Sequence, residues 1–60
     1  MDAMQISEYA HALYRAHGDS AEFEAARRSQ EKEAEGKIDE ARSWRSVQAA
    51  VRQLRGPGQS

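Results

Sequence analysis

Apolar positions recur along this 60-residue chain at the three-and-four spacing of amphipathic helices, and glycines interrupt the pattern. Gly18, Gly36 and the Gly56-Pro57 pair divide the chain into segments of helical length. The chain has no Thr and few other β-branched residues, whereas Ala, Glu, Arg and Gln, which favour helices, are frequent. The pattern therefore predicts three helices, at about residues 5–17, 20–35 and 38–55.

The first predicted helix has an apolar face formed by Ile6, Tyr9, Ala10, Leu13 and His17. Tyr9 and Tyr14 lie about 140° apart on a helix, so one face cannot hold both rings. We expect Tyr14 to be the exposed aromatic residue, His17 to be partly buried at the end of the helix and His11 to face solvent.

The second predicted helix opens at Asp19, whose carboxylate is expected to cap the first turn, with Glu22 completing a pair that resembles a capping box. Its apolar face is weak and consists of Phe23, Ala26, Gln30 and Ala34 beside Ala25. Because these residues are mostly small, we expect close approach of a neighbouring helix rather than interdigitation, and we expect this helix to be the most exposed.

The third predicted helix carries the strongest periodic signal, a stripe formed by Ala41, Trp44, Val47, Val51 and Leu54. Acidic residues near its start and Arg52 and Arg55 near its end suit the helix dipole. Gly56-Pro57 terminates it, and residues 57–60 are expected to form a frayed tail.

Short turns between helices make consecutive helices antiparallel neighbours. We therefore expect an all-α fold in a single domain over residues 1–56, either a small antiparallel three-helix bundle or a helical hairpin with an extra helix. Of the hydrophobic residues 11 are Ala, so few large side chains remain and the core of so short a chain must be thin.

Composition narrows the class of protein further. The absence of Cys excludes disulfides and thiolate metal sites. No apolar run of about 18 residues and no signal-peptide pattern is visible, so we expect a cytoplasmic chain without membrane contact. The net charge of −1 conceals a gradient from an acidic middle to a basic final third, and the near-neutral total argues against a general polyanion binder.

Catalytic and metal-binding patterns are weak. His11 and His17 are about 240° apart on a helix, and the sequence places no nucleophile beside His17. The alternating Glu31, Glu33 and Glu35 do not converge on one cation. We predict no enzyme activity, no cofactor, no metal site and no small-molecule substrate.

Arginines form an edge on the third helix, where Arg45, Arg52 and Arg55 fall within an arc of about 80° beside the apolar stripe. We favour an interpretation in which the Arg stems cover the core and the guanidinium groups pair with acidic residues of the second helix, namely Glu22, Glu24, Glu31 or Glu35. An acidic protein partner and nucleic acid are the other two interpretations of this edge.

The apolar stripe of the third helix is larger than the second helix can cover, and open apolar surface usually marks a partner. We therefore expect a non-enzymatic protein–protein interaction module, adaptor or regulatory, that is homo-oligomeric or docks on a larger protein. The candidate partner-binding residues are Tyr14, Trp44, Arg45, Val51, Arg52, Leu54 and Arg55. The alternative is a small nucleic-acid-binding regulator that uses the Arg edge.

Two resemblances add to this reading. The run from Gly36 to Ala41, between an Ala-rich and an amphipathic helix, resembles the inter-helix turn of a tetratricopeptide hairpin, although the early aromatic and Leu-Gly pair of that repeat are missing. The phrases Leu13-Tyr14-Arg15-Ala16-His17-Gly18-Asp19, Trp44-Arg45 and Arg55-Gly56-Pro57 are similar, in this order, to a group of short uncharacterised bacterial proteins, mainly alphaproteobacterial. This second resemblance implies a bacterial source and carries no activity.

Overall fold

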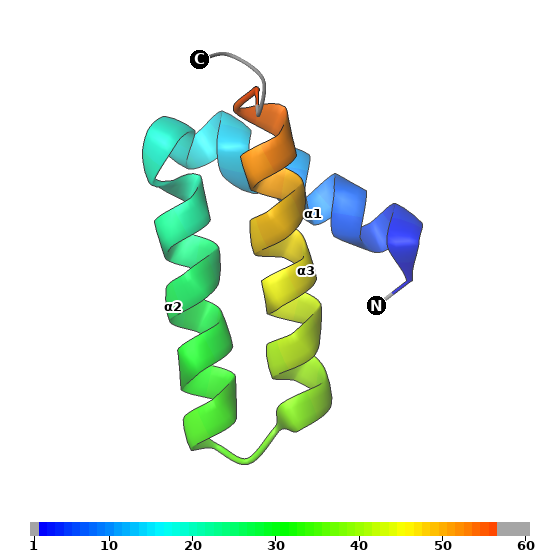
Figure 1. Cartoon of the computed structure of the whole chain (residues 1–60), viewed down its shortest axis with the longest axis vertical. Helices are drawn as coiled ribbons and strands as arrows, with labels where there is room; N and C mark the ends of the chain where they lie inside the picture. Colours follow the sequence, from blue (N-terminus) through cyan, green and yellow to red (C-terminus); the bar gives the residue numbers. More distant parts are fainter. Residues whose placement is uncertain (1, 57–60) are drawn as a thin grey trace.

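The computed structural model describes residues 2–56, and these form three helices joined by short turns (Figure 1). The elements in order are α1 (Ala3–His17), a 3₁₀ turn η1 (Gly18–Ser20), α2 (Ala21–Ala34) and α3 (Ile38–Leu54). The all-α prediction is confirmed, and each helix begins and ends close to its predicted position. The tail expected at residues 57–60, including the terminating Pro57, lies outside the described residues.

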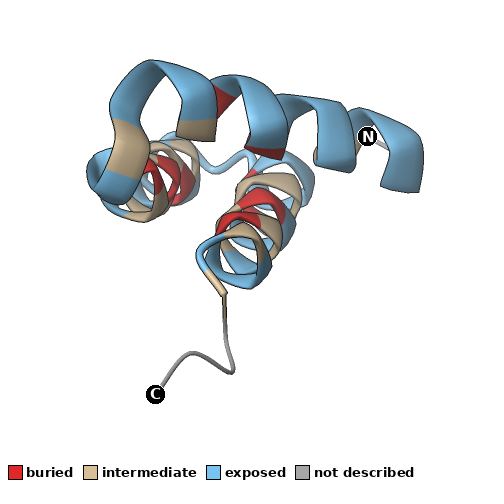
Figure 2. Ribbon diagram, turned by 90° about the horizontal axis from the view of Figure 1, so that it is seen from above, coloured by how far each residue is buried: buried red, intermediate tan, exposed pale blue. Residues whose placement is uncertain are grey.

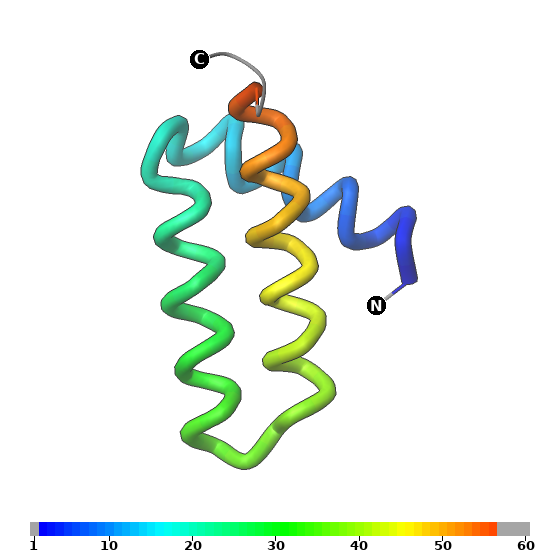
Figure 3. The backbone as a smooth tube through the Cα atoms, viewed as in Figure 1, coloured from blue at the N-terminus to red at the C-terminus, as the bar shows by residue number. Residues whose placement is uncertain are grey.

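Helices α2 and α3 form an antiparallel hairpin, and α1 runs across one face of it near the open end (Figures 1 and 3). The N-terminal half of α1 projects beyond α3, as the view from above in Figure 2 also shows. Helix α1 contacts α3 more than it contacts α2. The arrangement is thus a hairpin with an extra helix crossing it, rather than three helices packed side by side along their lengths.

A glycine with positive φ lies in each of the two turns between helices. Gly18 and Gly36 have φ angles of +62° and +80°, in the left-handed region that glycine adopts without steric cost. The Gly18 N–H donates to the carbonyl of Tyr14 and so ends α1.

Side-chain capping occurs at a different helix from the one predicted. No side chain caps α2, because the chain enters it through η1, whose Gly18 carbonyl accepts from the Ala21 N–H. The Ser20 hydroxyl turns back and donates to the His17 carbonyl at 2.9 Å. The prediction of an Asp19 cap is therefore wrong. A true capping box stands instead at the start of α1, where the Asp2 carboxylate accepts from the Gln5 N–H at 2.9 Å and the Gln5 side chain accepts from the Asp2 N–H.

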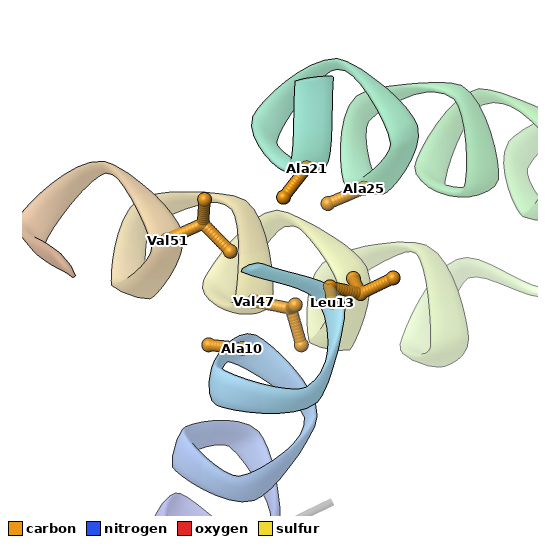
Figure 4. Close-up of a cluster of buried hydrophobic side chains, with 6 residues drawn as sticks. All are labelled: Ala10, Leu13, Ala21, Ala25, Val47 and Val51. Atoms are coloured by element: carbon orange, nitrogen blue, oxygen red, sulfur yellow. The ribbon is translucent and has the colours of Figure 1, made fainter. Parts of the chain in front are cut away.

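A small apolar core lies where the three helices meet (Figure 4). Among residues 2–56, the largest completely buried side chains are Val47 and Val51 of α3. The core consists of Ala10 and Leu13 from α1, Ala21 and Ala25 from α2, and Val47 and Val51 from α3. A core of three alanines, two valines and one leucine confirms that burial in this chain is limited.

Helix α2 turns its smallest side chains inward. Ala21 and Ala25 are fully buried, and the buried Ser29 hydroxyl donates to the Ala41 carbonyl of α3 at 3.1 Å. Small residues at this contact let the two helices approach closely, as expected. The predicted face of α2 is wrong, however, because Phe23 is 74% exposed and Gln30 and Ala34 are exposed. Alanine spaced by four residues fits against the Val47–Val51 ridge, whereas a Phe ring at that contact would push α3 away.

Candidate partner-binding groove

Below α1, the face of the α2–α3 hairpin is left open as a groove with a cavity volume of about 420 Å³. The groove forms because α1 crosses the hairpin instead of running along it (Figure 1). It draws on all three helices and is lined by Tyr9 of α1, Arg28, Glu31 and Lys32 of α2, and Glu40, Ser43 and Trp44 of α3.

Trp44 forms the aromatic centre of the groove. The Tyr9 ring meets it edge to face, with 5.7 Å between ring centroids and an interplanar angle of 63°. The guanidinium carbon of Arg28 lies 5.1 Å from the Trp44 ring centroid, within cation–π distance. Trp44 is partly buried and Tyr9 is 48% exposed, so the pair is held in place and still offers apolar surface to a ligand.

Two cations stand along the α2 side of the groove. Arg28 donates from Nε to Glu24 at 3.0 Å, and its terminal nitrogens make no hydrogen bond to any residue between 2 and 56. Lys32 lies 3.3 Å from Glu40 and 3.7 Å from Glu35. Hydrogen bonding to Glu40, followed by the charges of both carboxylates, raises the Lys32 pKa, so its ammonium group stays charged at neutral pH.

The acidic residues near the groove are already compensated. Glu31 accepts from Arg27 at 2.5 Å, and Glu40 is paired with Lys32. Hydrogen bonds from Arg27 first and Arg28 second hold the Glu24 pKa below its ordinary value. The groove therefore combines exposed aromatic surface with N–H groups that can still donate hydrogen bonds to a ligand.

The Arg edge of α3 lies on the other side of the hairpin and is paired with α2. Arg52 donates to Glu22 at 2.7 and 3.0 Å, Arg55 donates to Glu22 at 2.9 Å, and Arg45 donates to Glu33. The Arg52 hydrogen bond is the main cause that lowers the Glu22 pKa. The predicted pairing of these arginines with acidic residues of α2 is confirmed, with Glu22 as one of the partners named and Glu33 as an additional one.

The seven candidate partner-binding residues do not gather on one surface. Val51 is completely buried, so it cannot contact a partner, and its selection is wrong. Tyr14 and Leu54 are partly buried against the core. Tyr14 is not the exposed aromatic residue of α1, because its ring turns toward the core while Tyr9 opens to solvent. Among the seven, Trp44 alone lines the groove, and the three arginines lie at the paired edge.

The expected open stripe on α3 is largely closed. Helix α2 covers it from one side and α1 crosses it on the other, so Val47 and Val51 are enclosed within one subunit. What stays open is the Trp44 end of the stripe, together with exposed apolar side chains elsewhere, namely Met4, Tyr9, Phe23 and Ile38. The open surface is therefore displaced toward α1.

Arg28 and Lys32 are groove residues that sequence reasoning missed, whereas Tyr9 belongs to the predicted apolar face of the first helix. Arg28 and Lys32 are four residues apart, and they flank the stripe in which Ala21, Ala25 and Ser29 also recur every four residues. That small-residue repeat was the available signal for the buried side of α2. The apolar pattern of the sequence instead selects the face that carries the large side chain of Phe23, and this is not the buried side of α2.

The histidines add no site. His11 is exposed and its Nδ1 hydrogen-bonds with the Ser7 carbonyl at 2.8 Å, whereas His17 is exposed rather than partly buried as predicted. Within residues 2–56 there is no grouping of three or more His, Asp or Glu side chains that could hold a metal ion. In the same range, no helix has both the length and the hydropathy needed to cross a membrane.

No protein-family model, curated protein or solved structure matches this chain. The resemblances to a tetratricopeptide hairpin and to the short bacterial group therefore stay predictions.

Proposed function

We propose that this protein is a small, non-enzymatic interaction module, adaptor or regulatory, that binds a segment of another protein in the groove below α1. The observation that carries the proposal is the convergence of Trp44, Tyr9 and Arg28 at one concave site. Trp, Tyr and Arg are the residue types that dominate binding energy at protein interfaces. On the sequence features described above, we expect this binding to take place in the cytoplasm of a bacterium.

Protein is favoured over nucleic acid because of how the arginines of α3 are used. Arg45, Arg52 and Arg55 each pair with an acidic side chain of α2 or its preceding turn. A phosphate would have to displace a carboxylate held within the same chain, and Glu22 and Glu33 would then repel the nucleic-acid backbone. In the groove, by contrast, the terminal nitrogens of Arg28 have no carboxylate acceptor among residues 2–56, so a ligand can bind them without displacing one.

Site-specific photocrosslinking tests the proposal. A benzoylphenylalanine placed at Tyr9 reports on the groove, and the same group at Gln53, an exposed position on the outer side of α3, serves as the matched control. We expect ultraviolet light to produce a discrete protein adduct from the Tyr9 position, and we expect the substitution Trp44→Ala to abolish it. Equal adducts from both positions, or none from either, would count against a partner in the groove.

The molar mass of the protein by light scattering completes the test. If the Tyr9 adduct is a dimer of this chain and the solution mass is twice that of one chain, the partner is a second copy. If the mass is that of one chain, the adduct identifies a different protein.

A further inference from the structure

The donor groups of the groove define the chemistry of its occupant. Arg28 is held from two sides, by Glu24 at Nε and by the Trp44 ring beneath the guanidinium plane. Its two terminal nitrogens, with four N–H groups, have no acceptor among residues 2–56. An arginine oriented in this way is arranged to donate two parallel hydrogen bonds to a carboxylate.

A second cation lies one helical turn further along α2. Lys32 shares its ammonium group between Glu35 and Glu40 at 3.7 and 3.3 Å, which are ion-pair distances longer than a good hydrogen bond. An incoming carboxylate between Arg28 and Lys32 would therefore gain shorter bonds from groups that are already oriented.

An apolar neighbour of the carboxylate would fill the rest of the groove. The half-exposed Tyr9 and the partly buried Trp44 line the same groove as the two cations. A Phe or Leu side chain placed there would cover both rings, and such contacts contribute in proportion to the apolar area that leaves water.

A basic occupant fits less well. Of the two carboxylates in the lining, Glu31 is bound by Arg27 and Glu40 by Lys32, so neither is free to receive a cation. A Lys or Arg side chain entering the groove would meet Arg28 and Lys32 directly, and like charges at that distance repel.

We infer, as an extension that rests on the proposed function, that the groove binds a partner segment with an apolar side chain next to a carboxylate. In this arrangement the carboxylate lies between Arg28 and Lys32 while the apolar side chain covers Tyr9 and Trp44. The partner is thus an acidic peptide segment of another protein, and not a basic peptide.

Trp44 is the only tryptophan of the chain, so its fluorescence reports directly on this site. The probes are end-capped peptides that carry a Phe-Glu, a Phe-Gln or an Ala-Glu pair between glycines. The Phe-Glu and Phe-Gln peptides have the same shape and differ in charge, whereas the Ala-Glu peptide keeps the charge and lacks the ring. We expect the Phe-Glu peptide to bind at least about fivefold more tightly than either of the others, as a charge-assisted hydrogen bond in a partly open site allows.

Variants assign the preference to named residues. Arg28→Gln and, separately, Lys32→Gln should each reduce the preference for Glu over Gln to less than about twofold. Arg42→Gln, which removes an exposed arginine of α3 outside the groove, should leave it unchanged. Helical circular dichroism confirms that each variant is folded, and Lys32→Gln keeps the test valid if removal of Arg28 disturbs Trp44.

Three outcomes would overturn the inference. Equal binding of Phe-Glu and Phe-Gln shows a groove that does not select a carboxylate, although a docking groove would still stand. A Phe-Lys peptide of the same design serves as a fourth probe, and tighter binding of it than of Phe-Glu would reverse the sign of the proposed recognition. If no peptide changes the Trp44 fluorescence while the Tyr9 crosslink persists, the inference fails and the proposed function survives.

Discussion

Comparison of Val47→Ala with Phe23→Ala tests the packing of this protein. We expect the loss of the smaller side chain, Val47, to lower the free energy of unfolding more than the loss of Phe23. Val47 is completely buried between the three helices, whereas Phe23 of α2 is 74% exposed and lines a shallow pocket with Gln48 and Arg55 of α3. The apolar pattern of the sequence alone assigns Phe23 to an interior face, so the pair distinguishes the observed rotation of α2 from the expected one.

The expected magnitudes follow from burial. Val47→Ala removes two buried methyl groups at about 0.8 kcal/mol each and leaves a small cavity, for a total loss of about 2.5 kcal/mol in the free energy of unfolding. Phe23 buries about a quarter of a side chain of about 200 Å², worth about 1.2 kcal/mol, and alanine recovers about 0.5 kcal/mol through its higher helix propensity. The net cost of Phe23→Ala is therefore about 0.7 kcal/mol.

Urea unfolding followed by circular dichroism measures both changes. A core this small supplies a stability of about 3–5 kcal/mol, so Val47→Ala should remove half or more of it. With a urea dependence of about 1 kcal/mol/M, its midpoint should shift by about 2.5 M and that of Phe23→Ala by less than about 1 M. Equal shifts, or a larger shift for Phe23→Ala at every protein concentration, would refute the orientation of α2. A Phe23 effect that grows with concentration would indicate burial of the ring between copies.

Three further predictions use the same unfolding measurement. Ser29→Ala removes the buried hydrogen bond to the Ala41 carbonyl and should cost about 1 kcal/mol, while Ser46→Ala, at an exposed site on α3, should cost nothing measurable. Gly36→Ala should cost about 1 kcal/mol through backbone strain alone, because φ is +80° there and no atom lies within 4 Å of an added methyl group; a neutral result would mean that the turn differs. Pairing with Arg52 lowers the Glu22 pKa below its ordinary value of 4.5, so the ionised carboxylate stabilises the fold above about pH 4.5 and this contribution is lost as the pH falls through the lowered pKa. Stability should therefore fall more steeply on acidification in the unaltered protein than in Glu22→Gln, and parallel pH profiles would contradict the pairing.

Sequence reasoning located the helices well because their ends depend on local chemistry. Gly18 and Gly36 favour the positive φ that the turns require, and the 3.6-residue period of α3 is strong. The ion pairs between α3 and α2 also follow from helix position, since antiparallel neighbours bring the basic end of one beside the acidic start of the other.

Hydrophobic periodicity does not predict the rotation of α2 or the crossing of α1. Both depend on how closely backbones approach, and that is decided by Ala21, Ala25 and Ser29, whose small side chains carry almost no hydrophobic signal. The groove follows from the crossing, so its residues could not be grouped from periodicity. Tyr9, Arg28 and Trp44 are far apart in sequence and meet only because α1 lies across the hairpin.

The groove is lined by residues of both α1 and the hairpin, so its stability depends on the packing of α1 against the hairpin. One wall, Tyr9, belongs to α1, and the other lining residues belong to the hairpin, so local detachment of α1 would dismantle the site. The contacts that resist this opening are the buried Ala10 and Leu13 of α1, with Ile6 and Tyr14 partly buried against the core. An occupant that touches both parts must suppress the opening by mass action, and amide hydrogen exchange in α1 should slow in proportion to ligand concentration. Ligand binding in the groove should therefore stabilise the packing of α1 against the hairpin.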